Sequence, residues 1–164
     1  MNIFFLDRCP KQAAVYQCDR HVIKMILESA QMLCVTMHEF NVPDVPYGAT
    51  HRNHPCSIWA RSAWHNHLWL LEHAYALAEE HRRRWHPSAT GYQHASVSVL
   101  DWCAKQDVRS RFPQVELTMP ALAMPDDLKC DDPVESYRRY YRSVKAGFAT
   151  WRPPAERPHW WELS

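Results

Sequence analysis

Four polar residues recur along one side of a segment that is otherwise apolar: His21, Lys24, Glu28 and Gln31. At about 100° per residue in an α-helix, these four fall within roughly 80° of one another. The rest of the circumference between Cys18 and Leu33 is mostly apolar, which is typical of a buried helix. Buried charged groups must pair or line a wet cavity, so we expect this stripe to form a site for proton transfer. The alternative is a solvated face on which Lys24 and Glu28 form an ordinary ion pair.

A second polar group stands directly before Pro55 and consists of His51, Arg52, Asn53 and His54. Proline is favoured in the first turn of a helix, so this group lies at a helix entry. Free backbone amides at such an end bind anions, and an arginine with two imidazoles suits a phosphate or a developing negative charge. The alternative is that Asn53 or His54 only caps the helix.

Thiol and imidazole groups occur together in two short motifs, Cys18-x-x-His21 and His51-x-x-His54-x-Cys56. Neither spacing fits a zinc finger, a zinc ribbon or a deaminase site, so we predict no metal and no other cofactor. We expect the other histidines of the segment that follows to lie mostly on the surface: His65, His67 and His73.

Aromatic and basic residues alternate near the C-terminus. Five basic residues and no acidic one occur between Ser136 and Arg152, directly after an acidic stretch over 126–135. Aromatic rings stack on bases while guanidinium groups hold phosphates, so the segment predicts a nucleic-acid surface. The alternative is that the tyrosines pack in the core and the arginines are solvated. The residues of this surface are Tyr137, Arg138, Arg139, Tyr140, Tyr141, Arg142, Lys145 and Trp151.

Length and composition fit one folded domain over residues 1–164, because 46% of the 164 residues are apolar and 23% are charged. The net charge of +1 means that attraction to nucleic acid must come from a local patch. The six cysteines form no CxxC pair and no signal peptide precedes them, which predicts reduced thiols in a cytoplasmic protein with no membrane segment.

Helical patterns dominate the chain, and proline marks their ends. We predict an all-α fold, a compact single-domain helical bundle with three main helices, long loops that contain proline, and an N-terminal strand or buried arm over 2–6. The predicted helices span residues 11–40, 55–85 with an internal kink, and 132–148, with a shorter helix over 96–105. Residues 152–164 are expected to form an irregular tail.

Three of these features, in chain order, resemble the phage pyrimidine-dimer DNA glycosylases, which are small helical repair enzymes. Asp19-Arg20-His21 followed by Glu28 resembles the Asp-x-His and catalytic glutamate of that family. The segment from Asn53-His54 to the arginines before Trp85 resembles its second long helix. Residues 137–146 resemble its C-terminal tyrosine-rich basic segment. The chain is also similar to a group of small phage proteins without a known activity.

The resemblance implies a DNA-binding enzyme that removes a damaged or modified base through an imine formed by an amine. It assigns proton transfer to Glu28. The family's nucleophile is the amino group of an N-terminal threonine, whereas this chain starts with Met1 followed by Asn2. The Met1 amine and Lys24 are therefore both candidates, because a lysine forms imines once its pKa is lowered.

We thus expect a DNA glycosylase or abasic-site lyase, located in the host cytoplasm if the protein is phage-encoded. A second hypothesis is a non-catalytic phage accessory protein that binds nucleic acid or protein. A third is a nucleotide- or DNA-modifying enzyme, metal-dependent or not, that uses the same pocket. The predicted catalytic residues are Met1, His21, Lys24, Glu28 and His54. The predicted DNA contacts are Arg20, Gln31, His51, Arg52 and Asn53, with the C-terminal residues named above.

Overall fold

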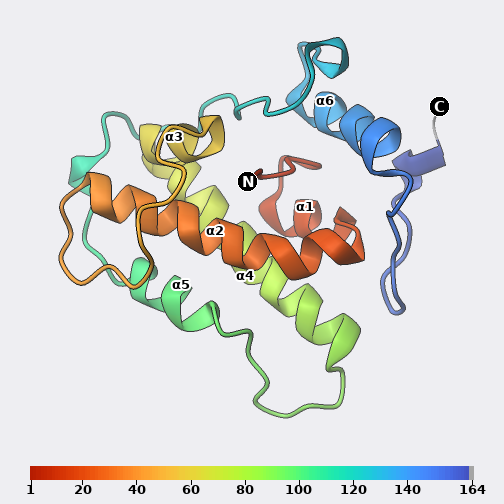
Figure 1. The fold of residues 1–164 in the computed structure, drawn as a ribbon, viewed down its shortest axis with the longest axis horizontal. Helices are drawn as coiled ribbons and strands as arrows, with labels where there is room; N and C mark the ends of the chain where they lie inside the picture. The colour runs from red at the N-terminus through yellow and green to blue at the C-terminus, as the bar shows by residue number, and fades with distance from the viewer. Residues whose placement is uncertain (163–164) are drawn as a thin grey trace.

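Two long helices cross at the centre of the molecule and the remaining elements surround them (Figure 1). The computed structural model describes residues 1–162. Within that range it contains six α-helices and no strand, which confirms the predicted all-helical class. The helices are α1 Pro10–Tyr16, α2 Asp19–Glu39, α3 Pro55–Ser62, α4 Trp64–Trp85, α5 Val97–Ala104 and α6 Pro133–Tyr140.

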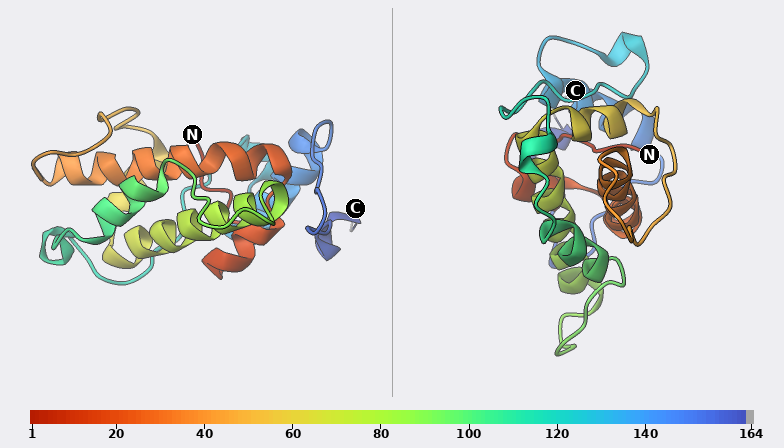
Figure 2. Two further views of the ribbon diagram at one scale, coloured as in Figure 1. Left: turned by 90° about the horizontal axis from the view of Figure 1, so that it is seen from below. Right: turned by 90° about the vertical axis from the view of Figure 1, so that its left-hand side faces the viewer.

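The helices pack in two layers when the molecule is turned (Figure 2). α2 packs on α4, and α1 packs on α4 in the lower layer. α3 and α5 each contact both long helices, so the core lies between α2 and α4. Within residues 1–162 no helix combines the length and the apolar character that crossing a bilayer requires.

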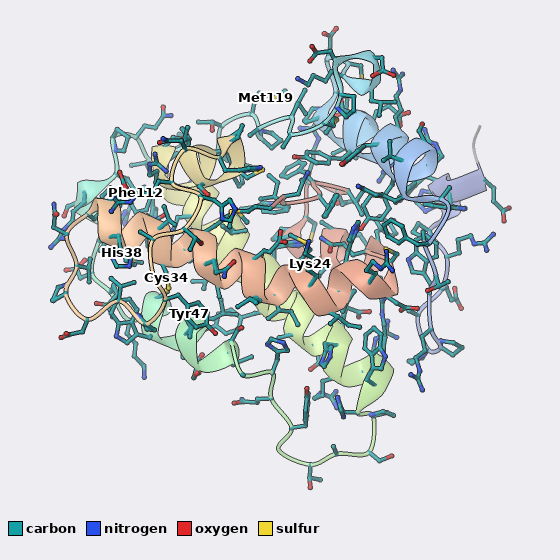
Figure 3. All side chains as sticks on the ribbon, in the orientation of Figure 1. Lys24, Cys34, His38, Tyr47, Phe112 and Met119 are labelled. Atoms are coloured by element: carbon teal, nitrogen blue, oxygen red, sulfur yellow. The ribbon has the colours of Figure 1, made fainter. Side chains whose placement is uncertain are left out.

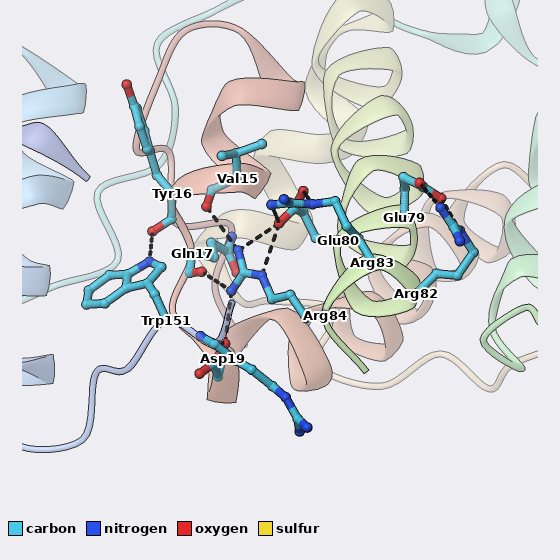
Figure 4. A network of polar contacts seen from close by, with 11 residues as sticks. Val15, Tyr16, Gln17, Asp19, Glu79, Glu80, Arg82, Arg83, Arg84 and Trp151 are labelled. Atoms are coloured by element: carbon cyan, nitrogen blue, oxygen red, sulfur yellow. Dashed lines mark hydrogen bonds and ion pairs between the residues drawn. The ribbon is translucent and has the colours of Figure 1, made fainter. Parts of the chain in front are cut away.

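The helix predicted over 11–40 is interrupted at Gln17 and Cys18, which are both extended. The buried Arg84 side chain, 0% exposed, causes this break, because its guanidinium occupies backbone carbonyls at the end of α1. It donates to the Gln17 carbonyl at 2.9 Å and to the Val15 carbonyl at 3.0 Å (Figure 4). Its charge is balanced by Glu80 at 2.9 Å and Asp19 at 3.2 Å. The break therefore allows α2 to begin in a new direction at Asp19.

The break predicted inside the segment 55–85 is confirmed at Ala63, whose backbone is extended between α3 and α4. In a continuous helix the Trp64 amide would donate to a carbonyl of the preceding turn. Here it donates to the Gln114 carbonyl of a later segment at 3.0 Å. The Asn66 side chain joins the same segment, because its carbonyl accepts from the Thr118 amide at 2.9 Å.

Residues 1–6 form a buried arm without regular structure, one of the two forms predicted. Asn2 shapes it, because its side-chain oxygen accepts from the amides of Ile3 at 2.8 Å and Phe4 at 3.0 Å. The Asn2 side-chain nitrogen donates to the Ala123 carbonyl at 2.9 Å. Phe4 has a φ of 44°, a left-handed conformation that is uncommon for a bulky residue. The arm turns sharply there and carries Met1 back toward α2.

The C-terminal helix begins as predicted, since Asp132 caps it by accepting from the Val134 amide at 3.1 Å. Glu135 pairs with Arg139 and Arg142, so it does not complete a capping box with Asp132. The regular helix ends at Tyr140 instead of continuing to residue 148. A five-residue π-helix, Tyr141–Lys145, follows it, and such widened turns are frequent at functional sites.

The prediction that His67 and His73 lie on the surface is wrong, because both side chains are buried in α4. His73 Nδ1 lies 2.8 Å from the Pro10 carbonyl and Nε2 lies 2.9 Å from the Gln17 side chain. These contacts fix α1 against α4. Burial lowers the pKa of each imidazole to about 4.

These two histidines are expected to make the fold acid-sensitive. A lowered pKa in the folded state means that the unfolded chain binds more protons between pH 6.5 and about 4. Stability is therefore full above pH 6.5 and decreases as the pH falls to about 4, by up to about 3 kcal/mol for each histidine. Urea unfolding at a series of pH values measures this slope. We expect His73→Gln to reduce the slope, and a slope unaffected by His73→Gln would contradict the assignment.

Candidate active site around the Met1 amine

A cavity of about 160 Å³ lies where the N-terminal arm, α2 and the end of α6 meet. Three of its residues belong to the polar stripe on α2, and the arm closes its inner side. Lys24 marks its position in the central part of the molecule (Figure 3). The lining residues are Met1, Asn2, Phe4, His21, Lys24, Met25, Glu28, Tyr140 and Lys145.

Glu28 joins the two candidate amines. Its Oε2 lies 3.5 Å from the Met1 amino nitrogen, and its Oε1 lies 3.1 Å from Lys24 Nζ. The Met1 side chain is 2% exposed and Glu28 is 12% exposed, whereas Lys24 is 64% exposed. The Met1 sulfur also accepts from the Ser57 hydroxyl at 3.4 Å, which helps to hold the first residue in place. The carboxylate therefore contacts one amine that is anchored by a buried side chain and one amine on a side chain at the surface.

His21 is the most enclosed polar member of the stripe. Its ring stacks on Phe4 with a centroid separation of 4.1 Å, and its Nδ1 lies 2.5 Å from the Tyr141 hydroxyl. Burial, reinforced by the positive charges of Lys145, Lys24 and Arg20, lowers the pKa of His21 to about 3. The imidazole is therefore neutral near pH 7.

His54 lies beside this group without lining the cavity. Its Nδ1 accepts from the Cys56 amide at 3.1 Å, so it caps α3, which is the alternative stated for this motif. Burial lowers the pKa of His54, and the positive Met1 amine and His51 lower it further, against the opposing effect of Glu28. The capping role explains its position.

Two cations near His21 contact aromatic rings: Lys145, which lines the cavity, and Arg20, which is exposed on α2. The Arg20 guanidinium lies 4.6 Å from the Phe148 ring centre, and Lys145 Nζ lies 4.4 Å from that of Tyr140. Neither takes part in an ion pair within residues 1–162. Lys24 and Lys145 thus bring positive charge to the cavity lining, where Glu28 balances the charge of Lys24.

Most of the predicted C-terminal surface is used in the fold instead. Tyr137 is buried and donates to the Ala121 carbonyl at 2.6 Å. Arg138 donates to the Leu6 carbonyl at 3.0 Å, and Arg142 donates to the Trp160 carbonyl at 3.0 Å. Trp151 donates to the Tyr16 carbonyl at 3.1 Å. We therefore correct their assignment to nucleic-acid contact: their polar groups satisfy backbone carbonyls between distant segments.

Tyr141 is corrected in the same way, because burial removes its ring from any surface that could stack on a base. Arg139 is exposed and pairs with Glu135 at 3.2 Å. Tyr140 and Lys145 are the members of the predicted segment that line the cavity. The register of the π-helix separates these residues from the buried Tyr141.

The residues before α3 lie away from the cavity lining. His51 and Asn53 are exposed, and Arg52 pairs with Glu39 at 3.2 Å, so its charge is partly balanced. Gln31 is half-buried, one turn beyond Glu28 on α2. The structure thus brings together Met1, Lys24, Glu28 and His21. The residues before α3 remain at the entry of that helix and do not line the cavity.

Three lining residues, Asn2, Phe4 and Met25, were missed by sequence reasoning. The only signal for Asn2 and Phe4 was their position directly after Met1, and Met25 gave only the signal of an apolar residue beside Lys24. In the described part of the chain, no three histidine, cysteine or acidic side chains are placed to hold a metal ion. All six cysteines are free. Comparison with protein-family models, with curated proteins and with solved structures finds no match to this chain.

Proposed function

We propose that this protein is a DNA glycosylase and abasic-site lyase in which the Met1 amine is the nucleophile. The observation that carries this proposal is the Met1 amino group 3.5 Å from Glu28, in a cavity that His21 also lines. Imine chemistry needs an amine that meets a sugar carbon, with a carboxylate beside it to move protons. The resemblance to pyrimidine-dimer glycosylases supports the same reaction class.

The anchoring of the side chain favours Met1 over Lys24 as the nucleophile. Lys24 is 64% exposed and approaches Glu28 from the rim, whereas the side chain that anchors the Met1 amine is 2% exposed. A buried side chain holds the amine in one orientation beside Glu28. Lys24 then acts at the mouth, where its charge attracts DNA.

The chemistry balances with the groups present. Glu28 first takes a proton from the Met1 ammonium and releases it to water. The neutral amine then attacks C1′ of the target nucleotide, a bond forms between the nitrogen and C1′, and the bond to the base breaks. The base leaves with the electron pair and takes up a proton. Glu28 accepts a proton from the new ammonium and passes it to O4′ as the C1′–O4′ bond breaks, which leaves a protonated imine. Loss of a C2′ proton then expels the 3′ phosphate, and this elimination cleaves the strand.

A cavity of about 160 Å³ cannot admit a duplex, so the target nucleotide must leave the base stack. Lys145 in the cavity lining and the exposed Arg20 beside His21 suit the flanking phosphates, because neither is neutralised by a carboxylate in residues 1–162. This places the substrate in the class of DNA with an extruded, damaged or abasic nucleotide.

Borohydride trapping tests the proposal, because it reduces an imine to a stable amine. The protein is first shown by intact mass to begin at Met1. It is then incubated with duplexes that carry an abasic site, an ultraviolet lesion or a modified base. We expect a covalent adduct whose peptide map places the DNA on Met1, with Lys24→Ala still forming it. The absence of an adduct on every duplex would overturn the proposal, and binding without an adduct would favour the non-catalytic hypothesis.

A further inference from the structure

The contact between His21 and Tyr141 determines which ring nitrogen carries a proton. His21 Nδ1 and the Tyr141 hydroxyl are 2.5 Å apart, and both side chains are buried. A phenol is a better hydrogen-bond donor than a neutral imidazole, and an imidazole nitrogen is a better acceptor than a phenol oxygen. The Tyr141 hydroxyl therefore donates to Nδ1, and the His21 proton resides on Nε2.

We propose that Tyr141 fixes His21 as its Nε2–H tautomer, so that His21 presents a neutral hydrogen-bond donor to the sugar oxygen of the extruded nucleotide. The assignment of the sugar rests on the proposed function, while the tautomer rests on the geometry of the free protein. His21 lines the cavity, and within residues 1–162 no partner lies within hydrogen-bond distance of its Nε2. Tyr141 is then a positioning residue that acts through His21.

The surroundings hold the imidazole in this role. Phe4 stacks on the ring at 4.1 Å and fixes its plane. The charged groups that face it are all positive, with Arg20 and Lys24 on α2 and Lys145 on the π-helix, and they oppose protonation. Burial raises the pKa of Tyr141 well above 10, so the phenol keeps its proton. The pair is neutral and its hydrogen-bond direction is fixed.

A neutral donor assists the step in which the C1′–O4′ bond breaks. Negative charge develops on O4′ in that step, and a preorganised N–H group stabilises it without giving up its proton. Glu28 supplies the proton that O4′ finally takes. Glu28 is therefore the acid and base of the site, and His21 acts only as a hydrogen-bond donor.

Nitrogen-15 spectroscopy of histidine-labelled full-length protein tests the tautomer without any substrate. We expect His21, assigned by the signal absent from His21→Gln, to show a protonated Nε2 and an unprotonated Nδ1 from pH 5 to 8. The opposite tautomer, or a mixture, would overturn the inference. The nitrogen-15 measurement does not depend on catalysis, so it tests the tautomer even when no DNA substrate reacts.

Tyr141→Phe and Tyr137→Phe form a matched pair. Each removes one hydroxyl from a fully buried tyrosine of the C-terminal helical segment, but only Tyr141 contacts His21. We expect Tyr141→Phe to give a mixture of tautomers and to lower the trapping rate about tenfold, since full loss of such a donor costs about 10²–10³-fold in other enzymes. Tyr137→Phe should keep the Nε2–H tautomer and the parent rate. Equal effects of the two variants on tautomer and rate would show a structural role only and would overturn the proposal.

Discussion

Glu28→Gln is expected to lower the rate of adduct formation by about 10²–10⁴-fold, the range associated with loss of a positioned acid or base. Glutamine preserves the shape of the side chain, and its one carbonyl oxygen can still accept a hydrogen bond from the Met1 amine or from Lys24. It cannot take a proton from the ammonium formed at C1′ or return one to O4′. Single-turnover trapping on an abasic duplex measures the rate, and a binding assay on the same duplex should show little change.

Glu39→Gln is the matched control for this experiment. It removes one carboxylate from the same helix, but Glu39 pairs with Arg52 and does not line the cavity. We expect the Glu39 variant to retain the parent rate. A Glu28 variant that traps DNA as fast as the Glu39 variant would remove Glu28 from the mechanism.

Blocking the Met1 amine is expected to abolish the adduct altogether. A short extension before Met1 converts the primary amine to an amide, which has no nucleophilic lone pair. The added residues must also enter a cavity of about 160 Å³ or displace the arm. Borohydride trapping, followed by peptide mapping, measures the loss.

The same extended chain, cleaved so that it begins again at Met1, provides the control. Cleavage is expected to restore the adduct to the level of the parent protein. If the extended chain traps DNA at full rate through Lys24, the nucleophile is Lys24 and the assignment of the Met1 amine is wrong. A loss that cleavage does not reverse would instead indicate damage to the fold.

Local sequence signals predicted the helix starts at Pro55 and Pro133, because a proline in the first turn and a cap before it act within a few residues. Such local signals could not predict the break at Gln17 and Cys18. It depends on Arg84, which follows Gln17 by 67 positions and takes its carbonyl. Only the folded chain brings the two together.

In the candidate site too, some residues could be predicted from local sequence spacing and others depend on the folded chain. Helical spacing alone places Lys24 and Glu28 together, because residues four apart share a helix face. Composition could not separate Tyr140 at the cavity from Tyr137 in the core, since both lie on α6 and the packing around that helix decides which ring is covered. The turn at Phe4 was equally hidden, because its positive φ is supported by Asn2 and the distant Ala123.

The order in which a ribosome makes the chain gives the buried arm a further significance. Asn2 bonds to Ala123 across 121 positions, and Arg138 bonds to Leu6 across 132 positions. Such contacts form only after most of the chain has been synthesised. The arm is therefore among the last segments to be enclosed, and the cavity that it lines is complete only once the C-terminal segment has been made.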